Sequence, residues 1–370
     1  MEITKVRLTE DNGLAVTVDK DMKSHGGSAG HEVLLSSQWL DELLSPNAPL
    51  ELRYGREYWD GSEIKDKVRR IDYEAFMQDE GTAFWDVIRD IMRLGIVFLR
   101  NVPRDEESVS RIALRIANIQ ETFYGRTFDV RAKPNAENVA YTSGYLGLHQ
   151  DLLYLEPVPF VQILHCIDNS CQGGESLFSD AERVGTMLDL LRRNPQYSFL
   201  QRLVEHTVPY GYARHGYRYG QNRPLLRPTG RNECEVYWSP PFQAEWREGY
   251  SAQEMADWVL GARIFEEAVN SPTSLYQTRM EPGDCVLFNN RRVLHGRTAF
   301  DLDGGGSRWL RGTYISKQDF LSKASYAPGS HVSSPRDARE RTANDEKARQ
   351  AALMATNTYK EMEAKARPDA

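Results

Sequence analysis

The feature that most constrains the fold is a run of short apolar strands, separated by glycine and proline, that begins near residue 139. A Pro-Gly-Asp turn within residues 281–284 separates two of the later strands. Short strands at regular spacing with turn signals are typical of a β-sandwich or a jelly roll. The segments expected to be extended are 159–168, 175–180, 203–213, 223–230, 234–240, the two flanks of the turn at 281–284, and 308–317.

Helical periodicity surrounds this β-rich part and divides the chain into three regions. Residues 1–65 are expected to form a small N-terminal β-rich module, with a hairpin turn at 11–13. Residues 66–333 are expected to form the main domain, which makes the fold class α+β and mainly β. Residues 334–370 are rich in Ala, Lys, Glu and Arg and are expected to be a polar helical or disordered tail. Helices are expected at 73–94, 107–119, 180–194 and 251–270, and a strand at 95–102.

Composition excludes several classes of function. The 370 residues carry a net charge of −7, which gives no footprint for binding phosphate backbones, so nucleic acid is not expected as a partner. No apolar run approaches the roughly 18 residues needed to span a membrane, and no signal or transit peptide is visible. The four cysteines contain no Cys-x-x-Cys pair and are too few for a disulfide scaffold. A reducing, cytoplasmic location is expected.

A candidate metal site lies in the runs LGLHQDLL and VLHGRTAF. Alternate residues of a strand share a face, so His149 and Asp151 can reach one ion together, with His295 arriving from a neighbouring strand. Two histidines and one carboxylate form the facial triad that holds ferrous iron with open coordination positions. Taken alone, the pattern also fits a surface histidine at 149 and a turn-capping histidine at 295. The arginine-bearing strand that follows His295 favours the iron site.

The segment AYTSGYLGLHQDLLYLEPVPFVQILHCIDNSCQGGESLFSDA (140–181) resembles the γ-butyrobetaine and trimethyllysine dioxygenases of the taurine-dioxygenase-like superfamily. The segments PGDCVLFNNRRVLHGRTAF (282–300) and HEVLLSSQWLDE (31–42) are also similar to that family. The resemblance implies a double-stranded β-helix, or jelly-roll, core with flanking helices. It also implies an oxygenase that uses Fe(II), 2-oxoglutarate and O₂. A homodimer is implied by the resemblance alone.

The resemblance assigns roles residue by residue. It implies that His149, Asp151 and His295 are the catalytic iron ligands, and that Arg308 pairs with the distal carboxylate of 2-oxoglutarate. Arg311 is the second choice, because a regular strand turns it to the other face. Ser176 matches a position that contacts the cosubstrate, and Leu164 matches a residue that lines its pocket. The alternatives are a surface arginine for Arg308, a strand serine for Ser176 and core packing for Leu164.

On the substrate side, the family holds a trimethylammonium group in a box of aromatic faces, because a quaternary cation has no N–H to donate. The residues that match are Tyr124, Phe128, Asn138, Tyr141 and Tyr314. Their alternative role is ordinary packing. The family's paired asparagines are replaced near residues 238–243, and its N-terminal zinc cysteines are absent. The basic stretch 213–227 makes another anionic group, such as a phosphonate, conceivable.

Three functions follow. The first is a dioxygenase that hydroxylates a trimethylammonium compound such as γ-butyrobetaine, or an analogue with another anionic end. The second is the same chemistry on an unrelated small molecule of specialised metabolism. The third is a non-catalytic small-molecule binding protein. Asp151 argues against a halogenase, which lacks the carboxylate ligand, and no nucleophile elbow supports a hydrolase.

Overall fold

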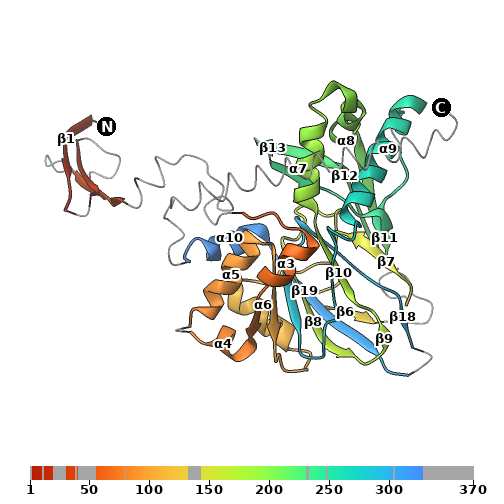
Figure 1. Cartoon of the computed structure of the whole chain (residues 1–370). Helices are drawn as coiled ribbons and strands as arrows, with labels where there is room; N and C mark the ends of the chain where they lie inside the picture. The colour runs from red at the N-terminus through yellow and green to blue at the C-terminus, as the bar shows by residue number, and fades with distance from the viewer. Residues whose placement is uncertain are drawn as a thin grey trace.

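A computed structural model describes most of the chain, which mixes helices and sheets (Figure 1). The described residues are 2–10, 12–19, 31–37, 40, 56–79, 81–131, 143–230, 233–246, 249–302 and 305–327. The region 334–370, expected as a tail, lies outside them. Among the described residues, no helix has the length and apolar character that crossing a bilayer requires.

The N-terminal residues form an antiparallel sheet of their own, with strands β1 (Glu2–Leu8), β2 (Leu14–Asp19) and β3 (His31–Leu35). The hairpin expected around residues 11–13 is confirmed. Thr9 N–H donates to the carbonyl oxygen of Gly13, and Asn12 adopts the left-handed φ of 60° that such turns require.

The end of this module lies earlier than the expected residue 65. Helix α3 (Gly61–Lys67) packs against strand β15 (Tyr276–Thr278), far along the chain. Trp59 and Ile64 are buried in the core of the main domain, and Trp59 donates through Nε1 to the carbonyl oxygen of Leu94. Residues 56–67 therefore belong to the main domain, because their apolar side chains are buried there.

Two antiparallel sheets make the centre of the main domain. The larger has six strands in the order β4 (Arg70–Asp72), β5 (Ile96–Arg100), β16 (Cys285–Asn289), β8 (Val161–Asn169), β19 (Arg308–Ile315) and β6 (Phe128–Arg131), with only the β4–β5 pair parallel. The smaller has four strands in the order β15, β10 (Ser176–Asp180), β17 (Val293–Arg297) and β7 (Leu146–His149). The strands expected at 95–102, 159–168, 175–180 and 308–317, and those flanking the turn at 281–284, are thus confirmed.

The two sheets pack face to face through aromatic side chains. Phe178 of β10 meets Phe98 of β5 edge-on, with ring centroids 6.1 Å apart, and lies 5.8 Å from Phe288 of β16. All three are buried, and they share one apolar cluster with Val293 and Leu310. The region between the sheets is therefore a packed core, except where a pocket opens at one end.

Helices cover the outer face of the six-stranded sheet (Figure 1). They are α4 (Tyr73–Met77), α5 (Ala83–Arg93), α6 (Ser108–Ile116) and α10 (Lys317–Ala324). Val97, Ile163 and Leu287 of the sheet share a buried cluster with apolar residues of these helices. The single helix expected at 73–94 is wrong: the chain leaves α4 at Gln78, whose backbone is extended, and α5 begins after Thr82.

A second layer of helices and hairpins covers the other end of the domain. Its helices are α7 (Ala181–Leu191), η2 (Pro195–Gln201), α8 (Arg202–Glu205), η3 (Pro240–Phe242) and α9 (Ala252–Val269). Its hairpins pair β11 (Thr207–Arg214) with β12 (Tyr217–Pro224), and β13 (Leu226–Gly230) with β14 (Glu233–Val236). Strands β9 (Gln172–Gly173) and β18 (Phe300–Asp301) form one more short pair. The helices expected at 107–119, 180–194 and 251–270 are confirmed, with α7 ending at Leu191.

A buried ion pair holds strand β17 in place. Nη2 of Arg292 lies 2.7 Å from Asp180 Oδ2, and the two side chains are 1% and 0% exposed. Asp180 ends β10 and caps α7, whereas Arg292 immediately precedes β17. Arg292 also donates to the carbonyl oxygens of Arg93 and Glu57. Because a buried pair is strongly destabilising when one partner is lost, this contact fixes the start of the strand that carries His295.

Candidate metal centre and its pocket

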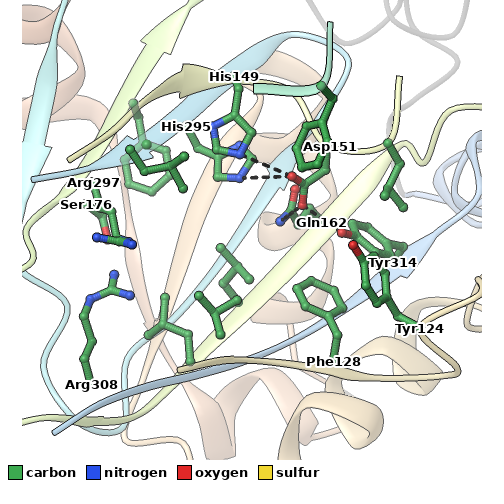
Figure 2. Close-up of a pocket in the computed structure, with 18 residues that line it drawn as sticks. Tyr124, Phe128, His149, Asp151, Gln162, Ser176, His295, Arg297, Arg308 and Tyr314 are labelled. Atoms are coloured by element: carbon green, nitrogen blue, oxygen red, sulfur yellow. Dashed lines mark hydrogen bonds and ion pairs between the residues drawn. The ribbon is translucent and has the colours of Figure 1, made fainter. Parts of the chain in front are cut away.

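The three predicted metal ligands converge on one point (Figure 2). His149 ends β7, Asp151 follows two residues later, and His295 stands directly opposite His149 on β17. Nε2 of His149 lies 3.3 Å from Asp151 Oδ1, and Nε2 of His295 lies 3.8 Å from the same oxygen. One ligand atom from each residue lies within 4.8 Å of the other two. This is the spacing of donor atoms arranged around a single ion.

The backbone around Asp151 is held from two sides. Its N–H donates to Asn290 Oδ1 at 2.8 Å, and Asn290 Nδ2 donates to its carbonyl oxygen at 3.1 Å. Gln150 exchanges hydrogen bonds with Trp238, and its carbonyl oxygen accepts from Ser239. Five hydrogen bonds thus tie the ligand segment to residues about 90 and 140 positions away along the chain.

The protonation states of the triad suit a metal. Nδ1 of His149 lies 2.9 Å from the carbonyl oxygen of Gly147, which can only accept, so Nδ1 carries the proton and Nε2 presents its lone pair. Burial, together with the nearby His149, lowers the pKa of His295 to about 3, so its ring is neutral. Burial would raise the pKa of Asp151, but its hydrogen bonds, among them the one that the Tyr314 phenol donates to Oδ2, hold it below its usual range. Neutral imidazoles and an ionised carboxylate are the states that bind metals.

The second carboxylate oxygen of Asp151, Oδ2, accepts hydrogen bonds from two side chains. Gln162 Nε2 and Tyr314 Oη each lie 2.7 Å from Asp151 Oδ2. Gln162 on β8 and Tyr314 on β19 are direct cross-strand partners. Oδ1 is thereby turned toward the two histidines, which favours binding of the ion through that single oxygen.

The pocket beside the triad lies between the two sheets. Six of the predicted cosubstrate and substrate residues line it: Tyr124, Phe128, Leu164, Ser176, Arg308 and Tyr314. Asn138 and Tyr141 lie outside the described residues. No residue of the basic stretch 213–227 lines this pocket, so the anion contact considered for that stretch is not formed here. Arg223 instead donates to the carbonyl oxygens of Leu153 and Leu155 and pairs with Glu156.

One end of the pocket is cationic. Arg308 is 6% exposed and lines it, whereas Arg311 points to the other face and pairs with Asp129 at 2.9 Å. The preference for Arg308 over Arg311 agrees with this geometry. Ser176 on β10 stands directly opposite Arg297 on β17, and both line the pocket.

The other end of the pocket is aromatic. Phe128 and Tyr314 stack with ring centroids 5.0 Å apart and an interplanar angle of 19°, and Tyr124 lies 6.1 Å from Phe128. Phe242, from the segment where the family's asparagines are replaced, also lines the wall. Because Phe128 and Tyr314 each cover a face of the other, these two rings form one continuous wall.

Sequence reasoning missed Arg297, Gln162 and Phe242. Arg297 could have been found, because it lies two residues after His295 on the same strand and therefore shares its face. Gln162 is the one strongly polar residue within the apolar run PFVQIL, which is also a signal. No sequence signal marks Phe242, because it follows two prolines in an irregular segment.

Comparisons with known proteins agree with this arrangement. Residues 55–314 match the family described as "Taurine catabolism dioxygenase TauD, TfdA family". Dioxygenase str8 of Strobilurus tenacellus is 35% identical over 304 residues, which cover 78% of this chain and 70% of that protein. Gamma-butyrobetaine dioxygenase of Pseudomonas sp. (strain AK-1) is 32% identical over 259 residues, covering 68% of this chain and 64% of that protein. The Homo sapiens protein of the same name is 28% identical over 269 residues, covering 72% and 68%.

Proposed function

Because the chain belongs to the TauD, TfdA family and is an Fe(II)- and 2-oxoglutarate-dependent dioxygenase, we propose that it hydroxylates an unactivated C–H bond of a small molecule held in this pocket. The observation that carries the proposal is the convergence of His149 and Asp151, at the end of β7, with His295 of β17 on one point. We also propose that the two facing sheets are the two halves of a jelly roll.

The residues present fit the iron and the cosubstrate. His149, Asp151 and His295 would hold the ion, and Arg308, with Ser176 and Leu164 beside it, would hold the distal carboxylate of 2-oxoglutarate. When bound, the iron supplies the redox chemistry by which 2-oxoglutarate and O₂ become succinate and CO₂ while a substrate C–H becomes C–OH. Arginine suits the anchoring task, because its planar fork matches a carboxylate.

The rest of the pocket positions the substrate and excludes water. Phe128, Phe242 and Leu152 present apolar surface beside Asp151, so a reacting carbon is held by shape and contact area. A misplacement of about an ångström can lower the rate on the order of a hundredfold. Phe128 lies on strand β6, which fixes the place of its ring in the wall.

For the substrate we propose a trimethylammonium compound such as γ-butyrobetaine first. Relatives that bear the name gamma-butyrobetaine dioxygenase match this chain, and the aromatic wall of Tyr124, Phe128 and Tyr314 offers cation–π attraction. The second candidate is an unrelated small apolar molecule. It is favoured by the stacking of Phe128 on Tyr314, which leaves a flat wall, and by Phe242 in the segment that lacks the family's asparagines.

The test is a screen for substrate-stimulated release of succinate from 2-oxoglutarate, run with Fe(II) in air. Betaines, phosphonate analogues and unrelated aromatic and aliphatic acids form the panel, and product mass reports the added oxygen. We expect stimulation by at least one class and its loss in His149→Ala. Succinate release that persists undiminished in His149→Ala contradicts the assignment of this metal site. A folded wild-type protein that releases no succinate with any compound contradicts the proposed activity and favours a non-catalytic binding protein.

A further inference from the structure

Two arginines, and not one, occupy the cationic end of the pocket. Arg297 and Arg308 are 3% and 6% exposed, and both line the pocket. Figure 2 shows their guanidinium groups directed toward each other, beside Ser176. They come from different sheets, Arg297 from β17 and Arg308 from β19, so the pairing is a product of the tertiary fold.

Arg297 lies on the same strand as the metal ligand His295, at a separation that a small dicarboxylate can span. His295 and Arg297 are two residues apart on β17, opposite Phe178 and Ser176 of β10. Two residues of a strand rise about 7 Å and return to the same face. A five-carbon diacid that reaches the triad with one carboxylate can therefore extend its other carboxylate toward Arg297.

The lining of the pocket suits an acidic ligand at this end. Among the described residues that line it, Asp151 is the only carboxylate, and its oxygens face the histidines, Gln162 and Tyr314. Guanidinium groups bind a carboxylate through charge-assisted, often bidentate, hydrogen bonds.

We propose that Arg297 is a second arm of the 2-oxoglutarate anchor, gripping the distal carboxylate from the side opposite Arg308. Nη1 of Arg297 donates to the carbonyl oxygen of Gly144 at 2.6 Å. A guanidinium has five donors in a rigid fork, so it can be fixed to the backbone through one nitrogen and hold a carboxylate through another. The inference rests on the proposed function, because it deepens the description of the same site.

The test compares two ligands that differ only in the distal carboxylate. Binding of 2-oxoglutarate and of 2-oxopentanoate to the Fe(II)-loaded full chain is measured by calorimetry without oxygen. We expect Arg297→Met to lose about tenfold to a hundredfold in affinity for 2-oxoglutarate, and less than about twofold for 2-oxopentanoate. Arg297→Lys, which keeps the charge without the fork, should fall between, and it serves as the folded variant if Arg297→Met fails to fold.

Two other variants calibrate the result. Arg308→Met should show the same carboxylate-dependent loss, whereas Arg227→Met, which removes an arginine paired with Glu235 away from the pocket, should bind both ligands as wild type does. Equal losses for both ligands in the Arg297 variants, or none for either, overturn the second-arm assignment alone. A wild-type protein that binds no 2-oxoglutarate overturns the proposed function with it.

Discussion

The phenol of Tyr314 donates a hydrogen bond to Oδ2 of Asp151, at 2.7 Å, from a ring that also stacks on Phe128. Tyr314 was expected as a wall of the substrate pocket. It is also a neighbour of the metal ligand, together with Gln162, which donates to the same oxygen. Such hydrogen bonds orient a ligating carboxylate before the ion arrives.

Tyr314→Phe should therefore lower metal affinity without changing the ligand set. Loss of a hydrogen bond to a ligating group reduces metal affinity by roughly tenfold to a hundredfold. Titration of the metal-free protein with Co(II), followed by its visible absorption, measures the change. Tyr210→Phe is the matched control, because it removes a buried phenol that donates to the carbonyl oxygen of Tyr237, outside the pocket. Equal Co(II) affinity in wild type and Tyr314→Phe would show that the hydrogen bond does not orient Asp151.

Metal binding should stabilise the fold through the triad. A metal that binds only the folded state at a hundred times its dissociation constant adds about 2.7 kcal/mol to the free energy of unfolding. Urea unfolding of the metal-free protein, with and without Mn(II), measures this gain. His295→Ala should show almost none of it, since it removes one of three ligands. A gain of the same size in that variant would place the ion elsewhere.

Gly312→Ala should disturb the aromatic wall. A Cβ at Gly312 would lie 2.4 Å from Cζ of Phe128 and 2.9 Å from Cδ2 of Leu164, so the Phe128 ring must move. We expect a loss of about 1–3 kcal/mol in the free energy of unfolding and a reduced stimulation of succinate release by substrate.

The control for this variant is Gly220→Ala in β12, where the nearest atom to an added Cβ is the Tyr210 carbonyl oxygen at 3.8 Å. Its unfolding free energy and turnover should stay close to those of wild type. If Gly312→Ala behaves like Gly220→Ala, the Phe128 ring is free to shift and does not define the pocket.

His165 should make stability fall in mild acid. It is fully buried on β8, both ring nitrogens have no partner among the described residues, and burial lowers its pKa to about 4 from 6.5. Between these two values the unfolded chain binds a proton and the folded chain does not, so the free energy of unfolding decreases as pH falls from 6.5 toward 4. The loss due to His165 should reach about 2 kcal/mol at pH 5.

This contribution is isolated by comparison with a variant. Urea unfolding at pH 7 and pH 5 is measured for wild type and for His165→Leu, and the other titrating groups cancel in the difference. The variant should lose about 2 kcal/mol less than wild type over that interval. Identical losses in the two proteins would mean that His165 is protonated in the folded state.

The metal ligands could be predicted because their signal is local. His149 and Asp151 are two residues apart in a segment that was expected to be extended, where alternate residues share a face. In the structure β7 ends at His149, and Asp151 still reaches the same point. His295 was identified by the turn and strand that precede it. Arg308 was proposed from the family resemblance, in which an arginine stands at the same spacing from the second histidine. Most strands and helices were equally predictable, because turn residues and hydrophobic periodicity act over fewer than twenty positions.

The other wrong predictions concern contacts between residues that lie far apart along the chain. The N-terminal module was predicted to reach residue 65, but Trp59 is buried against Leu94 and strands of the main domain. One continuous helix was predicted over residues 73–94 because apolar residues keep a helical spacing across the gap between α4 and α5.

By itself, the sequence determined the ligand set, the positions of most strands along the chain and the chemistry that two histidines and a carboxylate support. Only the tertiary structure decided that Tyr314 and Gln162 face Asp151 and that Arg297 faces Arg308. Periodicity tells which face of its own strand a side chain occupies. Which side chain it meets depends on pairing and packing between strands more than a hundred residues apart, and that is set by burial of the whole core.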